Sequence, residues 1–586
     1  MLFPQTNQYR QEVTLPCFWD FRFDPDNIGE AQGWFQGLEE FVPIAVPASW
    51  NDQFSDSRDY LGLGWYQTHF TLPWGWEGKK VYLRFGSVNY LASVWLNGKF
   101  IGLHEGGHLP FEFDITDDIL AEGNQLVVRV DGALAPDRVP PGNVPADPRD
   151  VSFFQNYPAA NFDFFPYCGI QRRVSIYAKV PDGIEDLIVT TEVSGTAGTV
   201  KVKLYSAKSN AQARFLLVGH GIQISQECTV INGEAEAVLN VADAALWQPG
   251  APNLYTLTAE LSSGGVGIDQ YKLSVGIRSI SVQGDLLLLN GKPVQLKGFG
   301  RHEDFAVIGR GFIPAVIIKD YSLLQWVGAN SFRTSHYPYS EEMLNLADRL
   351  GFLVIAETPA VGLFFAENGL EKRNQLCYQF TRELIERDRN HPSVIMWSLA
   401  NEPHSRPEIS TPIFKGLFDL AKSLDPTRPV TVVSDIGLCE ESFNFLDVIC
   451  MNRYCGWYSD AAQLDLGLVH LSAELDEIFK KFSKPMILTE FGADAIPGIY
   501  SDPSEVFSEE YQAEMILKTI SLLNSKPYIV GQHIWNLCDF KTTQSIHRAG
   551  GTNYKGIFTR DRRPKLSAHK LRELWRRETH PQGSKS

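Results

Sequence analysis

The second half of the chain alternates between short apolar segments and stretches with room for a helix, and this pattern constrains the fold more than any other feature. The eight apolar segments are Val294–Phe299, Ser331–Ser335, Phe352–Ala356, Val394–Leu399, Val430–Val433, Val448–Met451, Met486–Thr489 and Tyr528–Trp535. Each has the length of a strand, and their mostly apolar character is typical of a parallel sheet covered on both faces. Eight strands alternating with helices over about 300 residues predict a (β/α)8 TIM barrel.

One of the intervening helices has clear start signals. Ser340 precedes Glu341 and Glu342, and apolar residues then recur at helical spacing. A serine at the N-cap accepts a hydrogen bond from a free backbone N–H, and acidic residues in the first turn favour the helix dipole. The sequence therefore predicts a helix that begins directly after Ser340.

The first 276 residues have β character instead. Asn97-Gly98, between two apolar segments, is a strong signal for a two-residue hairpin. Sustained helical periodicity is scarce before about residue 180. From Leu187 to Ser274 short strands recur every 8 to 12 residues, as in Val200–Tyr205 and Tyr255–Leu261. This rhythm predicts a small β-sandwich before the barrel.

Two glutamates follow apolar strands of the predicted barrel. Glu402 comes after Val394–Leu399, and Glu490 comes directly after Met486–Thr489. Active sites of such barrels lie at the carboxyl ends of the strands, so both side chains are expected at one site. A single glutamate there is most often a capping or surface carboxylate, but two in matched positions are what glycoside hydrolysis requires. Other strand ends contribute polar and aromatic side chains: His302, Arg333, His336, Asn401, Asn452, Tyr454 and Trp535.

The run His302-Glu303-Asp304 raises the alternative of a metal site. Consecutive residues at a strand end cannot aim three side chains at one ion, so we predict no metal there. No cofactor is expected either, because hydrolysis by two carboxylates needs only water.

The charge balance limits the partners. Lys and Arg number 53 against 69 Asp and Glu, a formal net charge of −16. Nucleic-acid binding needs a surplus of Lys and Arg, so a nucleic-acid partner is not expected. The sequence has no run near the roughly 18 apolar residues that span a bilayer, so no membrane partner is expected.

Three features bear on the cellular compartment. The first eight residues, Met1–Gln8, have neither the basic start nor the apolar core of a signal peptide. The eight cysteines are scattered without a CxxC pair, and Asn-x-Ser/Thr acceptor sites are missing. We therefore expect a cytoplasmic protein, with secretion as the alternative if a signal peptide has been removed.

Four segments together resemble retaining glycoside hydrolase family 2. Ser398–Pro403 and Ile487–Gly492 are similar to the family's acid/base and nucleophile segments, and Gly298–Asp304 and Ala329–Pro338 to its first two barrel strands. The resemblance covers essentially the whole chain. It implies a jelly-roll sugar-binding-like β-sandwich over residues 1–180, an immunoglobulin-like β-sandwich over 181–276 and the catalytic TIM barrel over 277–586. It also implies a homo-oligomer, either a dimer or a tetramer.

Within the family, Asn452–Tyr458 and Asn553–Lys565 resemble the β-glucuronidases. In that group Asn553 and Lys555 would bind the C6 carboxylate of the sugar, supported by Arg548. A glucuronide is an anion and the whole chain is negative, so the site itself must be positive. From Lys541 to Ser586 the chain has 12 Lys and Arg against 3 Asp and Glu, although the helix expected over Ser567–Arg577 exposes much of that charge to solvent.

The resemblance implies a role for each candidate residue. Glu402 would be the general acid/base and Glu490 the nucleophile of a retaining exo-β-glucuronidase. Arg333 and Tyr454 would keep Glu490 anionic, and Asn401 would bond the 2-hydroxyl. The residues implied as other parts of the sugar pocket are Asp163, His302, His336, Asn452, Tyr458 and Trp535.

Two other functions stay open from the sequence. One is a β-galactosidase or β-mannosidase of the same family, for which Lys555 would have no role. The other is a carbohydrate-binding descendant without catalysis, although both carboxylates and their strand-end neighbours are present.

Overall fold

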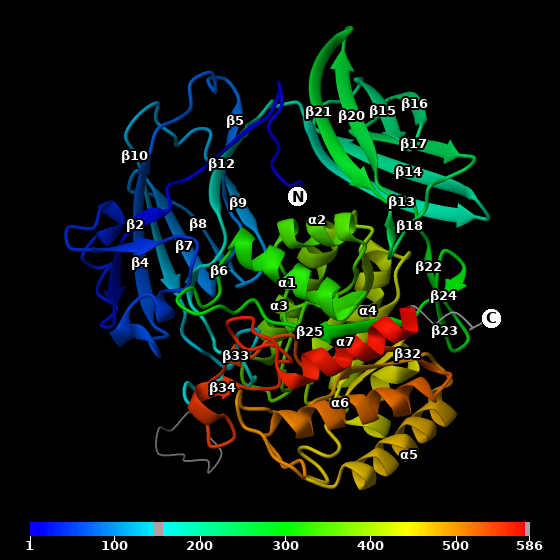
Figure 1. Cartoon of the computed structure of the whole chain (residues 1–586). Coiled ribbons are helices and arrows are strands. Elements are labelled where there is room, and N and C mark those ends of the chain that lie inside the picture. The colour runs from blue at the N-terminus through cyan, green and yellow to red at the C-terminus, as the bar shows by residue number, and fades with distance from the viewer. Residues whose placement is uncertain (144–155, 580–586) are drawn as a thin grey trace.

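The N-terminal body is a sandwich of two antiparallel sheets. The structure is a computed structural model that describes residues 1–143 and 156–579 (Figure 1). The strands of this body are β1 (Gln11–Thr14), β2 (Phe18–Asp24), β3 (Val42–Ala45), β4 (Leu63–Phe70), β5 (Lys80–Phe85), β6 (Val88–Asn89), β7 (Leu91–Leu96), β8 (Lys99–Glu105), β9 (Phe111–Asp114), β10 (Asn124–Asp131), β11 (Gly169–Ile170) and β12 (Val174–Lys179). The two main sheets have the orders β1-β12-β5-β9 and β3-β2-β4-β10-β7-β8.

Alternating side chains of both sheets meet in one core, which includes Phe21, Leu83 and Val128. The predicted hairpin is confirmed, because Asn97 and Gly98 connect β7 to β8 with φ angles of 52° and 76°. Both angles lie in the left-handed region that Asn and Gly tolerate best, and they belong to a turn whose twist matches that of the strands.

The second body is the predicted small sandwich (green in Figure 1). Its strands are β13 (Ile184–Ser194), β14 (Ala197–Ser206), β15 (Gln212–Gly219), β16 (Ile222–Thr229), β17 (Glu234–Val241), β20 (Tyr255–Ser263) and β21 (Val266–Val275). They form the sheets β13-β14-β17 and β16-β15-β20-β21. Val202 and Leu239 from one sheet pack with Phe215 and Leu257 from the other.

The third body is a closed barrel of eight parallel strands, which confirms the central prediction. The strands are β25 (Leu296–Gly300), β26 (Ser331–Arg333), β27 (Leu353–Glu357), β28 (Val394–Asn401), β29 (Val430–Ser434), β30 (Ile449–Asn452), β31 (Met486–Glu490) and β32 (Ile529–Ile534). β32 pairs with β25 and closes the ring. Each strand overlaps one of the eight predicted apolar segments.

Helices surround the barrel. They are α1 (Pro314–Val327), α2 (Glu341–Leu350), α3 (Leu370–Asp388), α4 (Ser410–Leu424), α5 (Leu464–Phe482), α6 (Glu509–Asn524) and α7 (Leu566–Thr579). The predicted start of α2 is confirmed, because the Ser340 hydroxyl accepts a hydrogen bond from the backbone N–H of Met343. The expectation of a helix in every gap is wrong between β29 and β30, where the turns Gly437–Cys439 and Glu441–Asn444 stand instead. Gly437 has φ 58°, a left-handed conformation that an α-helix cannot continue through.

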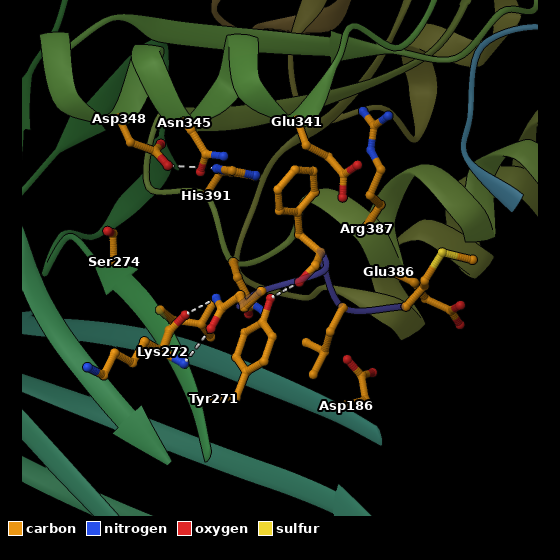
Figure 2. Close-up of a pocket in the computed structure, with 16 residues that line it drawn as sticks. Asp186, Tyr271, Lys272, Ser274, Glu341, Asn345, Asp348, Glu386, Arg387 and His391 are labelled. Carbon is orange, nitrogen blue, oxygen red and sulfur yellow. Dashed lines mark hydrogen bonds and ion pairs between the residues drawn. The ribbon is translucent and has the colours of Figure 1, made fainter. Parts of the chain in front are cut away.

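The N-terminal segment packs against the second sandwich. The Tyr271 hydroxyl of β21 donates to the Phe3 carbonyl at 2.8 Å, and the Lys272 N–H donates to the Gln5 side chain at 3.1 Å. This segment lines a cavity beside α2 and α3, in which His391 lies 2.6 Å from Asp348 (Figure 2). The cavity shares no lining residue with the one at the strand ends described below.

Short β-elements join the three bodies. They are β18 (Trp247–Gln248), β19 (Ala251–Pro252), β22 (Ile280–Gln283), β23 (Leu286–Leu289) and β24 (Lys292–Pro293). Residues 180–183 separate the first two bodies, and residues 276–279 separate the second sandwich from β22. The division at 180/181 and 276/277 stays a prediction.

Two further sequence expectations concern the whole chain. All eight cysteines are unpaired thiols. None of the helices in residues 1–143 and 156–579 combines the length and the apolar character that a bilayer span requires.

Candidate active site

A cavity of about 210 Å³ opens at the carboxyl ends of the barrel strands. It is lined by Asn161, Phe162, Asp163, His336, Val361, Gly362, Asn401, Glu402, His404, Asp435, Tyr454, Tyr458, Glu490, Trp535, Arg548 and Asn553. Three of these residues come from a loop of the first sandwich, and the Asn161 amide anchors that loop by donating to the Gly362 carbonyl at 2.6 Å. The cavity therefore has walls from two bodies.

Glu490 ends β31 at the base of this cavity. Its carboxylate accepts hydrogen bonds from the Arg333 guanidinium and from the Tyr454 hydroxyl, the latter at 2.6 Å. Burial and the neighbouring Glu490 raise the pKa of Tyr454 well above its usual range, so this hydroxyl stays protonated and donates. Two donors, one of them charged, favour the ionised form of Glu490.

Glu402 follows β28 in a different electrostatic environment. Its backbone has φ 42°, a left-handed conformation that costs a residue with a Cβ about 1–2 kcal/mol. Its N–H donates to the Val433 carbonyl at 2.8 Å, which holds this turn against β29. Burial, followed by the charges of Glu490 and Asp435, raises the pKa of Glu402 from 4.5 to about 8. The two glutamates therefore lie in different electrostatic surroundings, and burial and like charge favour the protonated form of Glu402.

Asn452 lies between the two glutamates. It ends β30 opposite Glu490 in the β30–β31 pairing, and its amide donates to Glu402 Oε1 at 2.6 Å. The Thr489 hydroxyl donates to Asn452 Oδ1 at 2.9 Å. Because this bond occupies Oδ1, the Asn452 NH2 group is directed at Glu402, while its contact with Asn401 Oδ1 is longer at 3.2 Å.

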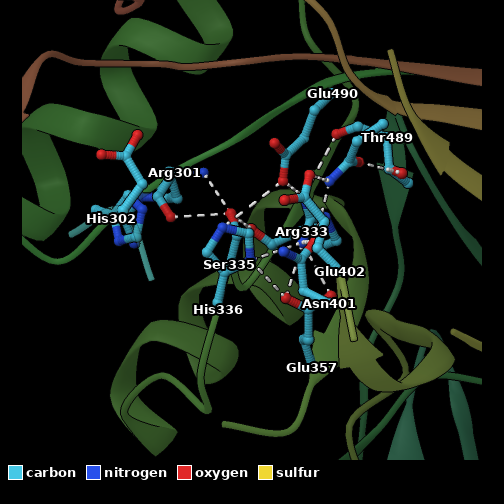
Figure 3. Close-up of polar contacts among 12 residues, drawn as sticks. Arg301, His302, Arg333, Ser335, His336, Glu357, Asn401, Glu402, Thr489 and Glu490 are labelled. Carbon is cyan, nitrogen blue, oxygen red and sulfur yellow. Dashed lines mark hydrogen bonds and ion pairs between the residues drawn. The ribbon is translucent and has the colours of Figure 1, made fainter. Parts of the chain in front are cut away.

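An ion cluster extends from the cavity floor into the barrel, and two of its members, Arg333 and Glu357, are 0% exposed (Figure 3). Arg333 Nη1 contacts both oxygens of Glu357, at 2.8 and 2.9 Å, while Arg333 Nη2 contacts Glu490. His336 Nδ1 lies 2.9 Å from Glu357. Burial raises the pKa of Glu357, but the Arg333 charge and the contacts from His336 and Ser398 outweigh it and hold that pKa below 4.5.

A second charged group lies at one side of the cavity. Arg548 Nε donates to Asp163 Oδ1 at 3.0 Å, and its Nη2 donates to the Tyr458 hydroxyl at 2.7 Å. The Asn553 amide donates to Asp163 Oδ2 at 2.9 Å. Asn553 is fixed because β34 (Thr552–Asn553) pairs with β33 (Phe540–Lys541) just after the last barrel strand. Asp163, Arg548 and Asn553 thus lie together on the cavity wall.

Lys555 contacts this group from behind the wall. Its ammonium pairs with Asp494 and lies 2.8 Å from the Tyr458 hydroxyl, and the residue is only 1% exposed. Asp494 also lies 3.5 Å from Arg548. Burial opposes ionisation of Asp494, but the charges of Lys555 and Arg548 outweigh it and lower its pKa. Asp494 is thus the counter-ion of Lys555, while Arg548 is paired with Asp163 and lies farther from Asp494.

Trp535 and His302 meet at the aromatic side of the cavity. The Trp535 ring stacks on His336 with 4.9 Å between centroids and meets the edge of His302 at 5.3 Å. His302 does not line the cavity in the described chain; its Nδ1 lies 3.0 Å from the Tyr337 hydroxyl. Of the other predicted site residues, Arg333, Asn452 and Lys555 likewise contact lining residues instead of lining the cavity themselves.

Sequence reasoning missed three acidic residues of the site. Glu357 ends β27, and Asp435 follows β29, so the rule applied to the other six strand ends would have found both. Asp494 follows Glu490 by four residues and carries no pattern of its own. Its role emerges only from its pairing with Lys555, 61 positions away.

The run from His302 to Asp304 does not converge on one point. His302 contacts Tyr337, whereas Glu303 pairs with Arg172 at 3.1 Å. Asp304 accepts a hydrogen bond from the Tyr167 hydroxyl at 2.9 Å.

The comparison with known families covers nearly the whole chain. The model described as glycosyl hydrolases family 2, sugar binding domain, matches residues 13–181. The model described as glycosyl hydrolases family 2 matches 183–278, and the family's TIM barrel domain matches 280–579. The chain therefore belongs to glycoside hydrolase family 2.

Similar full-length proteins agree with this assignment. The β-glucuronidase of Paenibacillus borealis is 40% identical over 98% of both chains. The human β-glucuronidase is 38% identical over 98% of this chain and 92% of its own. The crystal structure of Ruminococcus gnavus β-glucuronidase superposes with a TM-score of 0.92 at 37% identity, covering 98% of this chain and 99% of that one.

Proposed function

We propose that this protein is a retaining exo-β-glucuronidase, which hydrolyses β-D-glucuronides to D-glucuronate and an aglycone alcohol. The observation that carries the proposal is a pair of glutamates on one cavity whose surroundings favour opposite protonation states. Glu402 has a pKa raised to about 8, while Glu490 accepts hydrogen bonds from Arg333 and Tyr454. A retaining glycosidase needs one protonated and one ionised carboxyl group.

In the first step Glu490 attacks C1 of the sugar and forms an ester bond to it. The bond from C1 to the aglycone oxygen breaks, and its electron pair stays on that oxygen. Glu402 gives its proton to the same oxygen, so the aglycone leaves as an alcohol. Asn401 bonds the 2-hydroxyl of the sugar. This role is supported by its place in the cavity lining next to Glu402, with its Oδ1 accepting hydrogen bonds from Arg333 and Asn452.

In the second step the roles of Glu402 reverse. Now ionised, it takes a proton from a water molecule whose oxygen attacks C1. The ester bond to Glu490 breaks, D-glucuronate leaves with the β configuration retained, and both carboxyl groups return to their starting states. Water is the only co-substrate.

The sugar is selected by Arg548 and Lys555 together with Asn553. Arg548 and Asn553 lie on the cavity wall, with Lys555 behind them and joined to them through Tyr458. A C6 carboxylate bound here gains charge-assisted hydrogen bonds worth roughly 1.5–3 kcal/mol, and a neutral galactoside gains none. An incoming carboxylate also takes over part of the role of Asp494 as counter-ion.

Lys555→Ala is expected to lower the preference for 4-nitrophenyl β-glucuronide over 4-nitrophenyl β-galactoside by about 10- to 200-fold, corresponding to the loss of a charged hydrogen bond. The measurement is the ratio of kcat/KM for the two sugars on one preparation. Because this substitution removes the nearest cation from the buried Asp494, we expect it to destabilise the fold as well. The ratio removes that effect, since both sugars report on the same folded fraction.

Arg548→Ala tests the same preference at a residue that lines the cavity. It removes a cation that lines the cavity, so it is expected to reduce the same ratio. An unchanged ratio in both variants, or a parent that cleaves both sugars equally, would refute the glucuronide assignment and leave a β-galactosidase or β-mannosidase.

We further propose a cytoplasmic homo-oligomer, a dimer or tetramer, with contacts through the first sandwich and the barrel. The eight unpaired thiols favour a reducing compartment. Sedimentation of the full chain at micromolar concentration tests the assembly, and a particle with the mass of one chain would contradict it.

A further inference from the structure

Glu357 is a buried carboxylate that stands behind the attacking glutamate. It ends β27, has no exposed surface and does not line the cavity in the described chain. Arg333 and His336 contact its carboxylate, and the Ser398 hydroxyl donates to Oε2 at 2.8 Å. Such a group is costly to bury, and the structure surrounds it with enough partners to keep it charged.

Arg333 connects Glu357 to Glu490. Nη1 contacts both oxygens of Glu357, and Nη2 contacts one oxygen of Glu490. A guanidinium is planar and rigid, so fixing one nitrogen fixes the direction of the other. Arg333 is 0% exposed, so no bulk water competes for it. The orientation of Nη2 toward Glu490 therefore depends on Glu357.

His336 makes the same connection by a second route. Its Nδ1 lies 2.9 Å from Glu357 Oε1, and its Nε2 lies 3.6 Å from Glu490 Oε1. Stacking on Trp535 restricts the tilt of the ring, while Glu357 restricts its rotation. The Arg333 guanidinium and the His336 ring thus both lie beside Oε1 of Glu490, and Glu357 contacts both of them (Figure 3).

We infer that Glu357 is a positioning residue that holds Arg333 and His336 against Glu490 and so fixes the direction from which Glu490 attacks C1. The inference rests on the proposed function, in which Glu490 is the nucleophile. Glu357 touches neither substrate nor reacting atoms. Its contribution is to the geometry of attack, where a displacement of about 1 Å can cost 100-fold in rate.

Glu357→Gln keeps the size of the side chain and removes its charge. The probe is 2-deoxy-2-fluoro-β-glucuronyl fluoride, whose C2 fluorine slows the second step so that the ester on Glu490 accumulates. Fluoride leaves without a proton from Glu402, so the trapping rate reports attack by Glu490 alone. We expect a maximal trapping rate about 100-fold lower than that of the parent, with the half-saturating concentration within threefold. Glu357→Asp, which keeps the charge, should recover about tenfold.

A matched control separates positioning from stability. Asp425 is also buried and pairs with Arg428 at 2.6 Å, but at the opposite end of the barrel, where Arg428 contacts the carbonyl of Val394. Asp425→Asn should lower the melting temperature as Glu357→Gln does, and leave the trapping rate of the folded enzyme unchanged.

Ser398→Ala covers the case in which Glu357→Gln does not fold. It removes one hydrogen bond from Glu357 and leaves every charge in place, so trapping should slow about three- to tenfold. Trapping within twofold of the parent in whichever variant folds would overturn the inference. A parent that binds the fluoride without any trapping would refute the proposed function instead.

Discussion

Glu490→Ala is expected to lower kcat on 4-nitrophenyl β-glucuronide by at least about 10⁴-fold, because the covalent step loses its attacking group. The pocket left behind can admit a small anion. Sodium azide should then restore turnover and give the α-glucuronyl azide, since azide takes the place of Glu490 and attacks C1 from the same face. The anomer is read by proton NMR.

The parent and a Glu402 variant are the controls for that experiment. The parent should give no azide adduct, since water resolves the ester. Glu402→Ala should give the β-azide, because azide then attacks C1 of the glycosyl-enzyme from the face opposite Glu490, and the bond from C1 to the Glu490 oxygen breaks. If Glu490→Ala gave the β-azide, or kept more than a tenth of the parent kcat, Glu490 would not be the nucleophile.

Glu402→Gln is expected to show the second largest effect, and its size should depend on the leaving group. For an alkyl glucuronide we expect kcat/KM to fall about 10³-fold, the usual contribution of general acid catalysis. For 2,4-dinitrophenyl glucuronide, whose phenolate leaves unaided, the loss should stay within about tenfold. Equal losses on both substrates would contradict the assignment of Glu402 as acid.

The pH profile tests the same residue in the parent. Only the protonated form of Glu402 donates, and its pKa is raised to about 8, so kcat/KM should fall as the pH rises through about 8. This alkaline limb should be missing in Glu402→Gln. An alkaline limb at the same pH in that variant would belong to another group.

The raised pKa also has a stability consequence with a defined sign. Between pH 4.5 and about 8 the folded state holds a proton on Glu402 that the unfolded chain has lost. Stability therefore falls as the pH rises through this window. Glutamine resembles the protonated form and titrates in neither state, so Glu402→Gln should melt higher than the parent at pH 8 and equally at pH 4.

Much of the fold was predictable because it depends on local patterns. Eight apolar segments of strand length and the Ser340 cap are readable from neighbouring residues, and the structure confirms them. The rule that strand ends form the site then placed Glu402 and Glu490 at one cavity. The gap between β29 and β30 was predicted wrongly, because length alone admits a helix and the left-handed Gly437 does not.

From local patterns alone, the site was predictable only where its residues stand at strand ends, and Asp163, Arg548, Asn553 and Lys555 were predicted from the family resemblance instead. Asp163 lies in a loop of the first sandwich, and its pairing with Arg548 spans 385 positions. Such a contact depends on how two bodies meet, which no local periodicity encodes. The same holds for His302, whose place behind the cavity wall follows from the packing of Trp535 and Tyr337 around it.

By itself, the sequence determined the order of strands and helices, the barrel and the residues at most of its strand ends. The physical reason is that strand and helix periods, turns and caps act within a few residues. Only the tertiary structure determined which charged groups lie next to one another at the site. It put Arg333 between two carboxylates, paired Lys555 with Asp494, and raised the pKa of Glu402 by burial beside Glu490. These effects depend on distances of a few ångströms between distant segments and on the exclusion of water, and both exist only once the chain has folded.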